Sequence, residues 1–140
     1  PRKGIRKNMA SYRVREGPVT AADSFTALTS LYGQSTSSSV QVPAGNSAIV
    51  GLIVAVSQNS ATEDNCTFAV QLTGDAMTEQ QTLTVGAATN VGTETSNGMT
   101  ILPFSLDVAI PVTASNQVSI AGAMDADMGE AQFSVTLIFA

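Results

Sequence analysis

From Ser35 onward, apolar residues alternate with polar residues in short runs, and turn-forming residues separate the runs. Successive side chains of a β-strand point to opposite faces, so this alternation predicts strands with one buried face. The clearest example places Cys66, Phe68, Val70 and Leu72 on one face before the turn at Gly74-Asp75. A chain patterned in this way is typical of an antiparallel β-fold.

The alternation predicts seven or eight strands at a spacing of roughly 8–14 residues. The apolar runs are Ser38–Val42, Ser47–Ser57, Cys66–Leu72, Gln80–Val85, Phe104–Ile110, Gln117–Met124 and a C-terminal run with Phe133, Val135, Leu137 and Phe139 on one face. The near-continuous apolar stretch Ile49–Val54 suits a strand that is buried on both faces. We interpret Pro103 as a break between strands, and residues 86–98 as a long connection or a weak edge strand.

Residues 18–34 allow two interpretations. With Asp23 as a cap, the spacing of Phe25, Leu28, Leu31 and Tyr32 fits one face of a short helix. The threonines at positions 20, 26 and 29 fit a β-strand equally well. The sequence leaves both interpretations open.

Seven or eight antiparallel strands in one chain predict a two-sheet sandwich, either immunoglobulin-like or a jelly roll. The chain has no Trp and a single Cys, whereas an immunoglobulin core normally contains a Cys…Trp…Cys set. We therefore predict an all-β fold, with an antiparallel two-sheet sandwich that forms a single jelly roll of about eight strands. The predicted division is a basic N-terminal arm and connecting segment at residues 1–34, followed by the jelly-roll domain at residues 35–140.

Charge divides the chain into two parts. All six basic residues lie within the first fifteen positions, and all eleven acidic residues lie from Glu16 onward. The basic residues are Arg2, Lys3, Arg6, Lys7, Arg13 and Arg15. Because residues 1–17 carry too little apolar surface to offset the entropy of ordering, we predict that they form an extended arm.

These six cations are the candidate site. When Lys and Arg side chains bind the phosphates of a nucleic acid, they release its condensed counterions, and this gain does not depend on the base sequence. The six cations therefore predict sequence-independent contact with nucleic acid. Tyr12 beside Arg13 adds an aromatic ring that can stack on a base. The acidic surface of a neighbouring copy and an anionic membrane are the alternative partners of the arm.

The body is poor in catalytic chemistry. The chain has no His, and no Lys or Arg follows Arg15, which excludes a Ser-His-Asp or Cys-His relay and a Cys/His zinc site from the body. We therefore expect no enzyme activity, no catalytic residue, no metal ligand, no cofactor and no small-molecule substrate. Asp125, Asp127 and Glu130 are interpreted as a charged turn rather than a calcium loop.

Three local features complete the interpretation. The single Cys66 permits no internal disulfide, and its place in the alternation predicts a small buried hydrophobe. Asn65-Cys66-Thr67 matches the N-glycosylation acceptor pattern, and glycosylation of Asn65 stays open. No apolar run follows the basic start, so we do not expect an uncleaved signal peptide, and Ala48–Val56 is too short to span a membrane.

The basic segment Arg2–Arg15, followed by strands from Ser38 to Ala140, resembles the single jelly-roll capsid proteins of icosahedral viruses. Its compact body and the scarcity of basic residues there look more like the capsid proteins of archaeal or bacterial DNA viruses than those of plant RNA viruses. The resemblance lies in architecture and composition, and it carries over no functional residue beyond the basic arm.

The resemblance implies a structural virion protein that self-assembles into a capsid shell with itself and other virion proteins. Its arm would face the genome, an internal membrane or neighbouring subunits. The alternatives are an extracellular fibre or pilus subunit, in which residues 18–32 would serve as a donated strand, and a capsid-decorating protein.

Overall fold

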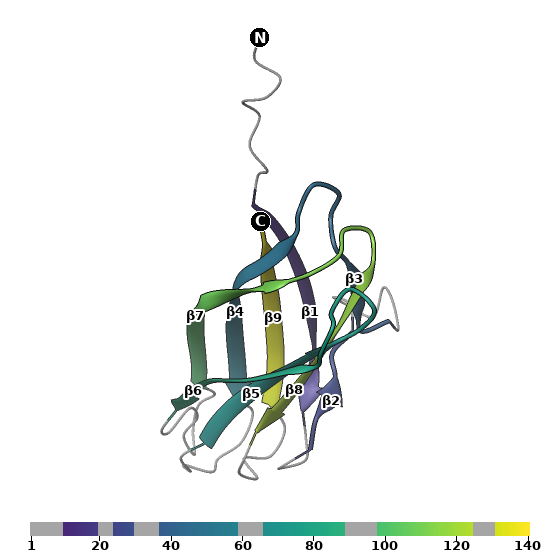
Figure 1. Ribbon diagram of the computed structural model, residues 1–140. Helices are drawn as coiled ribbons and strands as arrows, with labels where there is room; N and C mark the ends of the chain where they lie inside the picture. Colours follow the sequence, from purple (N-terminus) through teal and green to yellow (C-terminus); the bar gives the residue numbers. More distant parts are fainter. Residues whose placement is uncertain (1–9, 20–23, 30–36, 59–65, 89–97, 125–130) are drawn as a thin grey trace.

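The computed structural model describes residues 10–19, 24–29, 37–58, 66–88, 98–124 and 131–140 (Figure 1). Within these ranges the chain forms nine strands and no helix, which confirms the predicted all-β fold. In chain order the strands are β1 (Ser11–Val19), β2 (Thr26–Ala27), β3 (Ser39–Gln41), β4 (Ala48–Gln58), β5 (Cys66–Thr73), β6 (Gln81–Ala88), β7 (Gly98–Pro111), β8 (Gln117–Met124) and β9 (Ala131–Phe139).

The strands form two antiparallel sheets with jelly-roll winding. One sheet has the order β1-β9-β4-β7, and the other has the order β2-β8-β5-β6 with β3 also paired to β8. Because β2 and β3 both pair with β8 and lie one after the other along it, they share one place in the sheet. The nine strands therefore occupy eight positions in the two sheets. The first position pairs with the last, the second with the seventh, the third with the sixth and the fourth with the fifth. A long hairpin wrapped around itself gives this pairing, which is that of a jelly roll.

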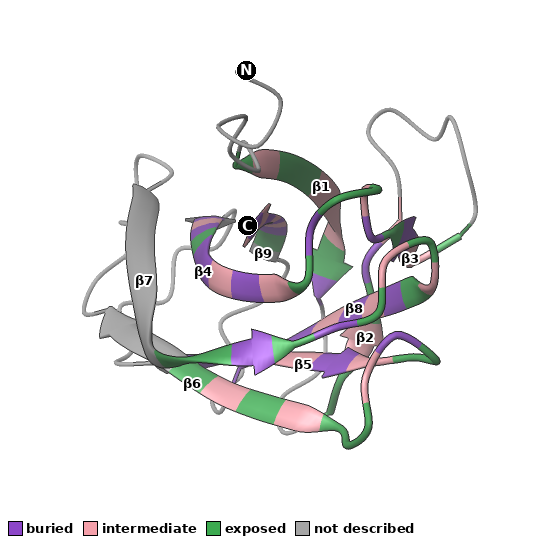
Figure 2. Ribbon diagram, turned by 45° about the horizontal axis from the view of Figure 1, so that its top comes forward, coloured by how far each residue is buried: buried purple, intermediate pink, exposed green. Residues whose placement is uncertain are grey.

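The core lies between the two sheets and follows the predicted alternation. Phe133, Val135, Leu137 and Phe139 of β9 are all buried, as are Phe68, Val70 and Leu72 of β5 (Figure 2). The rings of Phe68 and Phe133 meet edge to face across the core, with their centroids 5.7 Å apart. A Cβ atom at Gly122 of β8 would lie 2.7 Å from the ring of Phe133, so this close approach requires glycine.

Two predictions about the first sheet are wrong. The apolar stretch Ile49–Val54 is not buried on both faces, because Ile53 on the outer face of β4 is 37% exposed. Pro103 does not separate two strands; it lies within β7, opposite Ile53. Since β7 is an edge of the sheet, only one of its flanks makes backbone hydrogen bonds to a neighbouring strand. Proline, which has no backbone N–H, is therefore tolerated in this strand.

The N-terminal region contributes more to the sandwich than we predicted. Residues 11–17, expected in the extended arm, belong to β1, which pairs with β9 in continuous register from Ser11↔Phe139 to Val19↔Ala131. Backbone hydrogen bonds to β9 supply the stabilisation that the polar side chains cannot. The structured part of the chain therefore begins well before the predicted boundary between residues 34 and 35.

The β-type interpretation of residues 18–34 holds for the residues that are described. Thr26 and Ala27 form β2, and Thr29 makes an isolated bridge with Glu16 of β1. The buried side chain of Leu28 packs into the sandwich core rather than along a helical face. Asp23, Leu31 and Tyr32 lie outside the described residues.

Candidate functional site

Arg15 belongs to the sandwich rather than to a free arm. It lies opposite Val135, a buried residue of β9, which places it on the inner face at the edge of its sheet. Its Nε donates to the carbonyl of Ser37 at 3.1 Å, and its Nη2 donates to the carbonyl of Ser39 at 2.6 Å. Its Nη1 donates to the carbonyl of Val14 at 2.9 Å. Arg15 therefore links β1 of one sheet to β3 of the other.

Arg13 and Tyr12 occupy the exposed start of β1. The guanidinium of Arg13 donates one hydrogen bond, from Nη1 to the carbonyl of Tyr12 at 2.8 Å, and the residue is otherwise exposed. The side chain of Tyr12 is 57% exposed. A cation and an aromatic ring are thus both presented to solvent at this end of the strand.

The outer edge of β1 is protected by these two arginines. Glu16 exchanges both backbone hydrogen bonds with Thr29, at 2.8 and 2.9 Å, on the side away from β9. Because residues two apart in a strand turn their backbone groups to the same side, the carbonyls of Tyr12 and Val14 also face this edge. The Arg13 guanidinium donates a hydrogen bond to the carbonyl of Tyr12, and the Arg15 guanidinium donates one to the carbonyl of Val14. Because these carbonyls are already bonded, pairing with a further strand is hindered.

Replacing Arg15 with lysine is expected to lower the free energy of unfolding by about 1–3 kcal/mol, because the charge remains but the forked donors to three carbonyls are lost. Arg13→Lys is the matched control, since Arg13 makes only one exposed hydrogen bond, and its effect is expected to stay within about 0.5 kcal/mol. Urea denaturation of both variants measures the difference. Equal losses would contradict the linking role of Arg15.

The other four predicted cations, Arg2, Lys3, Arg6 and Lys7, lie outside the described residues. The chain attaches them to the start of β1, at the end of the sandwich where Ser11 pairs with Phe139. This end also carries Arg13. The described residues thus bring two of the six predicted site residues together on one strand and give the other four a common point of attachment.

The opposite end of the sandwich is joined to acidic segments. The strand ends Val19, Gln58, Ala88 and Met124 lie at this end, as their pairing with the starts of β5, β7 and β9 shows. The sequence that connects these strand ends to the next strands, at residues 20–23, 59–65, 89–97 and 125–130, contains seven of the eleven acidic residues. These connections, including Glu63-Asp64 and the predicted charged turn at Asp125–Glu130, lie outside the described residues.

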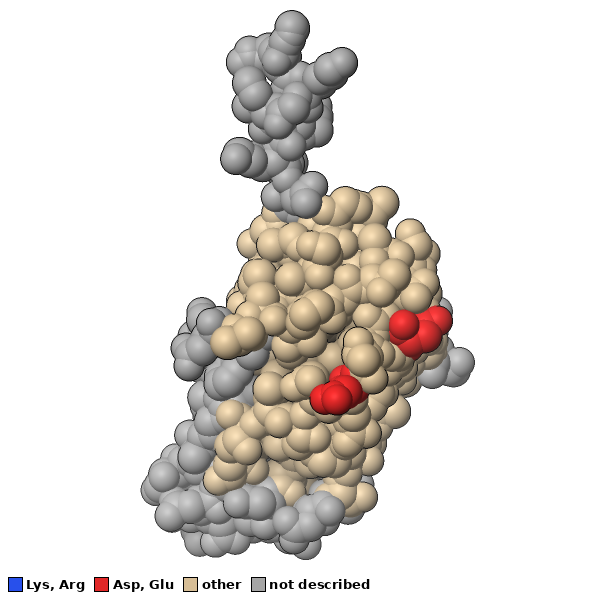
Figure 3. Space-filling model, viewed as in Figure 1, with Lys and Arg blue, Asp and Glu red and all other residues tan. Residues whose placement is uncertain are grey.

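The outer face of the second sheet carries no charged side chain among the residues described there. Gln71 of β5 lies between Ala121 of β8 and Thr82 of β6 in one row across the sheet. Ser119 of β8 lies between Thr73 and Ser39 in the next row, where the Ser39 and Ser119 hydroxyl oxygens are 2.7 Å apart. Figure 3 shows described carboxylates as isolated patches on an otherwise uncharged surface, with no described Lys or Arg on this view.

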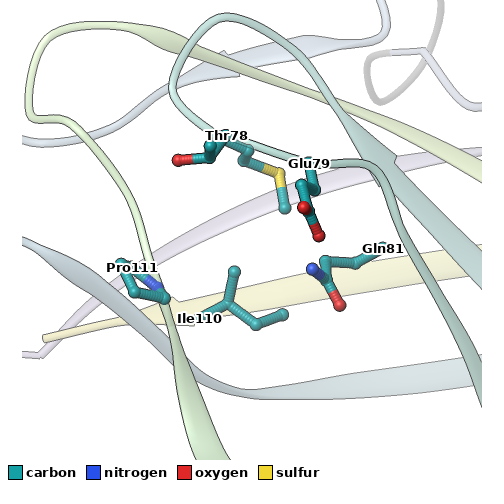
Figure 4. Close-up of a pocket in the computed structure, with 6 residues that line it drawn as sticks. Thr78, Glu79, Gln81, Ile110 and Pro111 are labelled. Carbon is teal, nitrogen blue, oxygen red and sulfur yellow. The ribbon is translucent and has the colours of Figure 1, made fainter.

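A small pocket lies at the cation-bearing end, between the β5–β6 connection and the end of β7 (Figure 4). It has a volume of about 210 Å³ and is lined by Met77, Thr78, Glu79, Gln81, Ile110 and Pro111. Its position depends on Gly74, which has a φ of 124°, and on Asp75, whose Oδ1 accepts the backbone N–H of Gln117 at 2.7 Å. A Cβ at Gly74 would collide with the carbonyl of Gln117, so a larger residue would displace this connection.

The described residues hold no group of three or more His, Cys, Asp or Glu side chains that is arranged to bind a metal. Cys66 begins β5, but its side chain and Asn65 are outside the description, so the predictions made for them remain predictions. No helix in the described ranges is long and apolar enough to cross a membrane.

The fold and the charged end together define a jelly-roll sandwich with a cationic N-terminus. No known protein family matches the sequence, and no curated protein matches it. Among solved structures, a chain from a structure titled "nora virus structure" is similar over 93% of this chain, with a TM-score of 0.34 and 9% sequence identity. This chain spans 55% of the length of that chain.

Proposed function

We propose that this protein is a structural subunit that self-assembles into a capsid shell, with its basic N-terminal segment on the inner side of the shell. The observation that carries the proposal is the separation of charge along the sandwich. Four of the six cations precede β1 in the sequence and Arg13 lies near its start, whereas seven of the eleven acids lie in sequence joined to the other end. Asp75 and Glu79, in the connection from β5 to β6, are the described acids at the cationic end. Such a unit favours one orientation toward a polyanion, with its cationic end inward.

The surfaces of the sandwich support assembly through faces and loops. The uncharged outer face of the second sheet loses no solvated charge when it is covered, whereas burial of unpaired charges is costly. The protected edge of β1 disfavours edge-to-edge growth into a fibre. The jelly roll is also a fold of viral capsid domains, among other classes of protein.

The body supports a structural role rather than a catalytic one. The chain has no His, and no Lys or Arg follows Arg15, so the sandwich beyond β1 lacks these side chains as a general base, a nucleophile or an electrophilic stabiliser at neutral pH. We propose that its partners are copies of itself, other virion proteins and the packaged nucleic acid. An inner membrane would offer the same anionic surface to the basic segment.

Strand donation receives less support. The segment considered as a donor, residues 18–32, is partly used within its own sandwich. Pro18 and Val19 pair with β9, and β2 pairs with β8. Donating these residues would break both pairings, so a fibre or pilus subunit is a less favourable interpretation.

Trypsin offers a direct test because it cuts only after Lys and Arg, and all of these lie in the first fifteen residues. We expect electron microscopy of the purified protein to show closed shells, and trypsin to leave the chain intact in the shells. After dissociation, trypsin should remove the residues up to Lys7, detected by intact-protein mass spectrometry. A protease specific for Glu, which has sites only from Glu16 onward, serves as the accessibility control.

Two results would overturn the proposal. A protein that stays monomeric at high concentration would exclude a self-assembling shell subunit. Intact shells that lose their N-terminal residues to trypsin as fast as dissociated subunits would place the basic segment on the outside.

A further inference from the structure

The pocket beside β7 has the size and chemistry of a site for one long side chain. Its volume of about 210 Å³ lies below the roughly 300 Å³ at which sites for small-molecule ligands begin. Ile110 and Pro111 of β7 form one wall, and the carboxylate of Glu79 and the amide of Gln81 come from the opposite side (Figure 4). An apolar wall beside a carboxylate suits the aliphatic stem and charged head of Lys or Arg.

The sequence restricts which cation can enter this pocket. Glu79 is exposed and forms no ion pair with another described residue. Because no Lys or Arg follows Arg15, any cation that this protein offers to Glu79 comes from the first fifteen residues of some copy. Arg15 is held by three carbonyls. Arg13 is anchored on β1, where its guanidinium donates to the carbonyl of Tyr12, whereas Arg2, Lys3, Arg6 and Lys7 precede the strand by four or more residues and have the longer reach into a neighbouring copy.

We propose that this pocket receives a Lys or Arg side chain from residues 2–7 of a second copy of the chain. This inference rests on the proposed self-assembly and names one contact within it. The pocket adjoins β7 and the basic segment is attached to β1, and these strands are the two opposite edges of the same sheet. When identical subunits associate head to tail in the direction that runs across this sheet, the β1 side of one copy lies beside the β7 side of the next. A side chain inserted into the pocket makes this contact without pairing a strand to the protected edge of β1.

The contact is testable by zero-length cross-linking. A carbodiimide joins a Lys amine to a carboxylate only when the two are in direct contact. We expect nuclease-treated assemblies made from equal amounts of ¹⁴N- and ¹⁵N-labelled protein to give a peptide linking Lys3 or Lys7 to Glu79, with the two labels mixed. Adding 0.5 M NaCl should reduce its yield, because an exposed ion pair is screened by salt.

Two matched variants isolate the pocket. Glu79→Gln removes the carboxylate and the cross-link, and should weaken association about two- to fivefold per contact, as expected for an exposed pair. Glu16→Gln makes the same change of charge on β1, away from the pocket, and should leave both the cross-link and the association unchanged. Sedimentation velocity measures the association.

The outcomes separate this inference from the proposed function. Shells that form normally while the cross-link is absent would overturn the pocket contact and leave the shell proposal standing. A Glu79 cross-link found only within single-label chains would also overturn it, because the segment would then bind its own copy. Absence of shells would overturn the proposed function itself, whatever the cross-linking shows.

Discussion

Replacing Phe133 with alanine is expected to lower the free energy of unfolding by about 3–5 kcal/mol, the usual cost of truncating a buried phenylalanine. Phe133 is 1% exposed and meets Phe68 edge to face, so the variant loses both core volume and an aromatic pair. Guanidinium chloride denaturation of dissociated subunits measures the loss. Ser134→Ala, at the neighbouring outward-facing position of β9, is the control and should change stability by less than about 0.5 kcal/mol.

The packing of Phe133 on Gly122 predicts a second, coupled effect. Gly122→Ala alone is expected to cost about 1–3 kcal/mol, because its new Cβ would lie 2.7 Å from the ring. Once Phe133 is also alanine, the added methyl group has space. The double variant should therefore be more stable than the sum of the single effects indicates, by roughly 1 kcal/mol or more. Strict additivity would contradict the close approach.

The sequence predicts a strand well where one face of the strand meets the core and the other meets solvent. The predicted run Gln117–Met124 has the bounds of β8, and the four alternating apolar residues of β9 are all buried. The alternation does not reveal why residue 122 is glycine. The reason is the ring of Phe133, which belongs to β9 of the other sheet and packs against Gly122. Such contacts depend on how the sheets stack, and alternation within one strand does not encode stacking.

The alternation of apolar and polar residues does not predict the full extent of the two edge strands of the first sheet, β1 and β7. For β1, the charges of Arg13 and Arg15 indicated a solvated arm, whereas Arg15 binds carbonyls that lie 22 and 24 residues further along the chain. The sequence around Arg15 does not indicate such distant partners. The alternation of Tyr12 and Val14 with the two arginines was a signal for a strand that the charge concealed. For β7, Pro103 indicated a break because the sequence does not reveal that the strand lies at an edge.

The candidate site was predictable in part. Composition identified the six cations without ambiguity, since all of them precede Glu16. It did not distinguish Arg15, which links β1 to β3, from Arg13, whose guanidinium makes one exposed hydrogen bond. The pocket was missed because its walls come from the β5–β6 connection and from β7, about thirty residues apart in the chain. Topology alone brings Glu79 beside Ile110.

Changing Arg2, Lys3, Arg6 and Lys7 to glutamine is expected to remove most of the salt-dependent affinity of the subunit for nucleic acid. Each phosphate neutralised on a duplex contributes about −0.9 to the slope of log affinity against log salt. Four such contacts give a slope of about −3.6, which is about a hundredfold loss of affinity between 50 and 200 mM salt. Fluorescence anisotropy with a labelled duplex measures both the affinity and the slope.

Arg13 and Arg15 provide the sharper comparison, because they carry the same charge two residues apart on one strand. Arg13→Gln should reduce the magnitude of the slope by about 0.9, since its guanidinium is exposed and makes a single hydrogen bond. Arg15→Gln should leave the slope unchanged while it lowers stability, because three carbonyls occupy its donors. If both substitutions flatten the slope equally in folded protein, Arg15 exchanges its carbonyl partners for phosphate, and charge rather than hydrogen bonding decides which arginines bind nucleic acid.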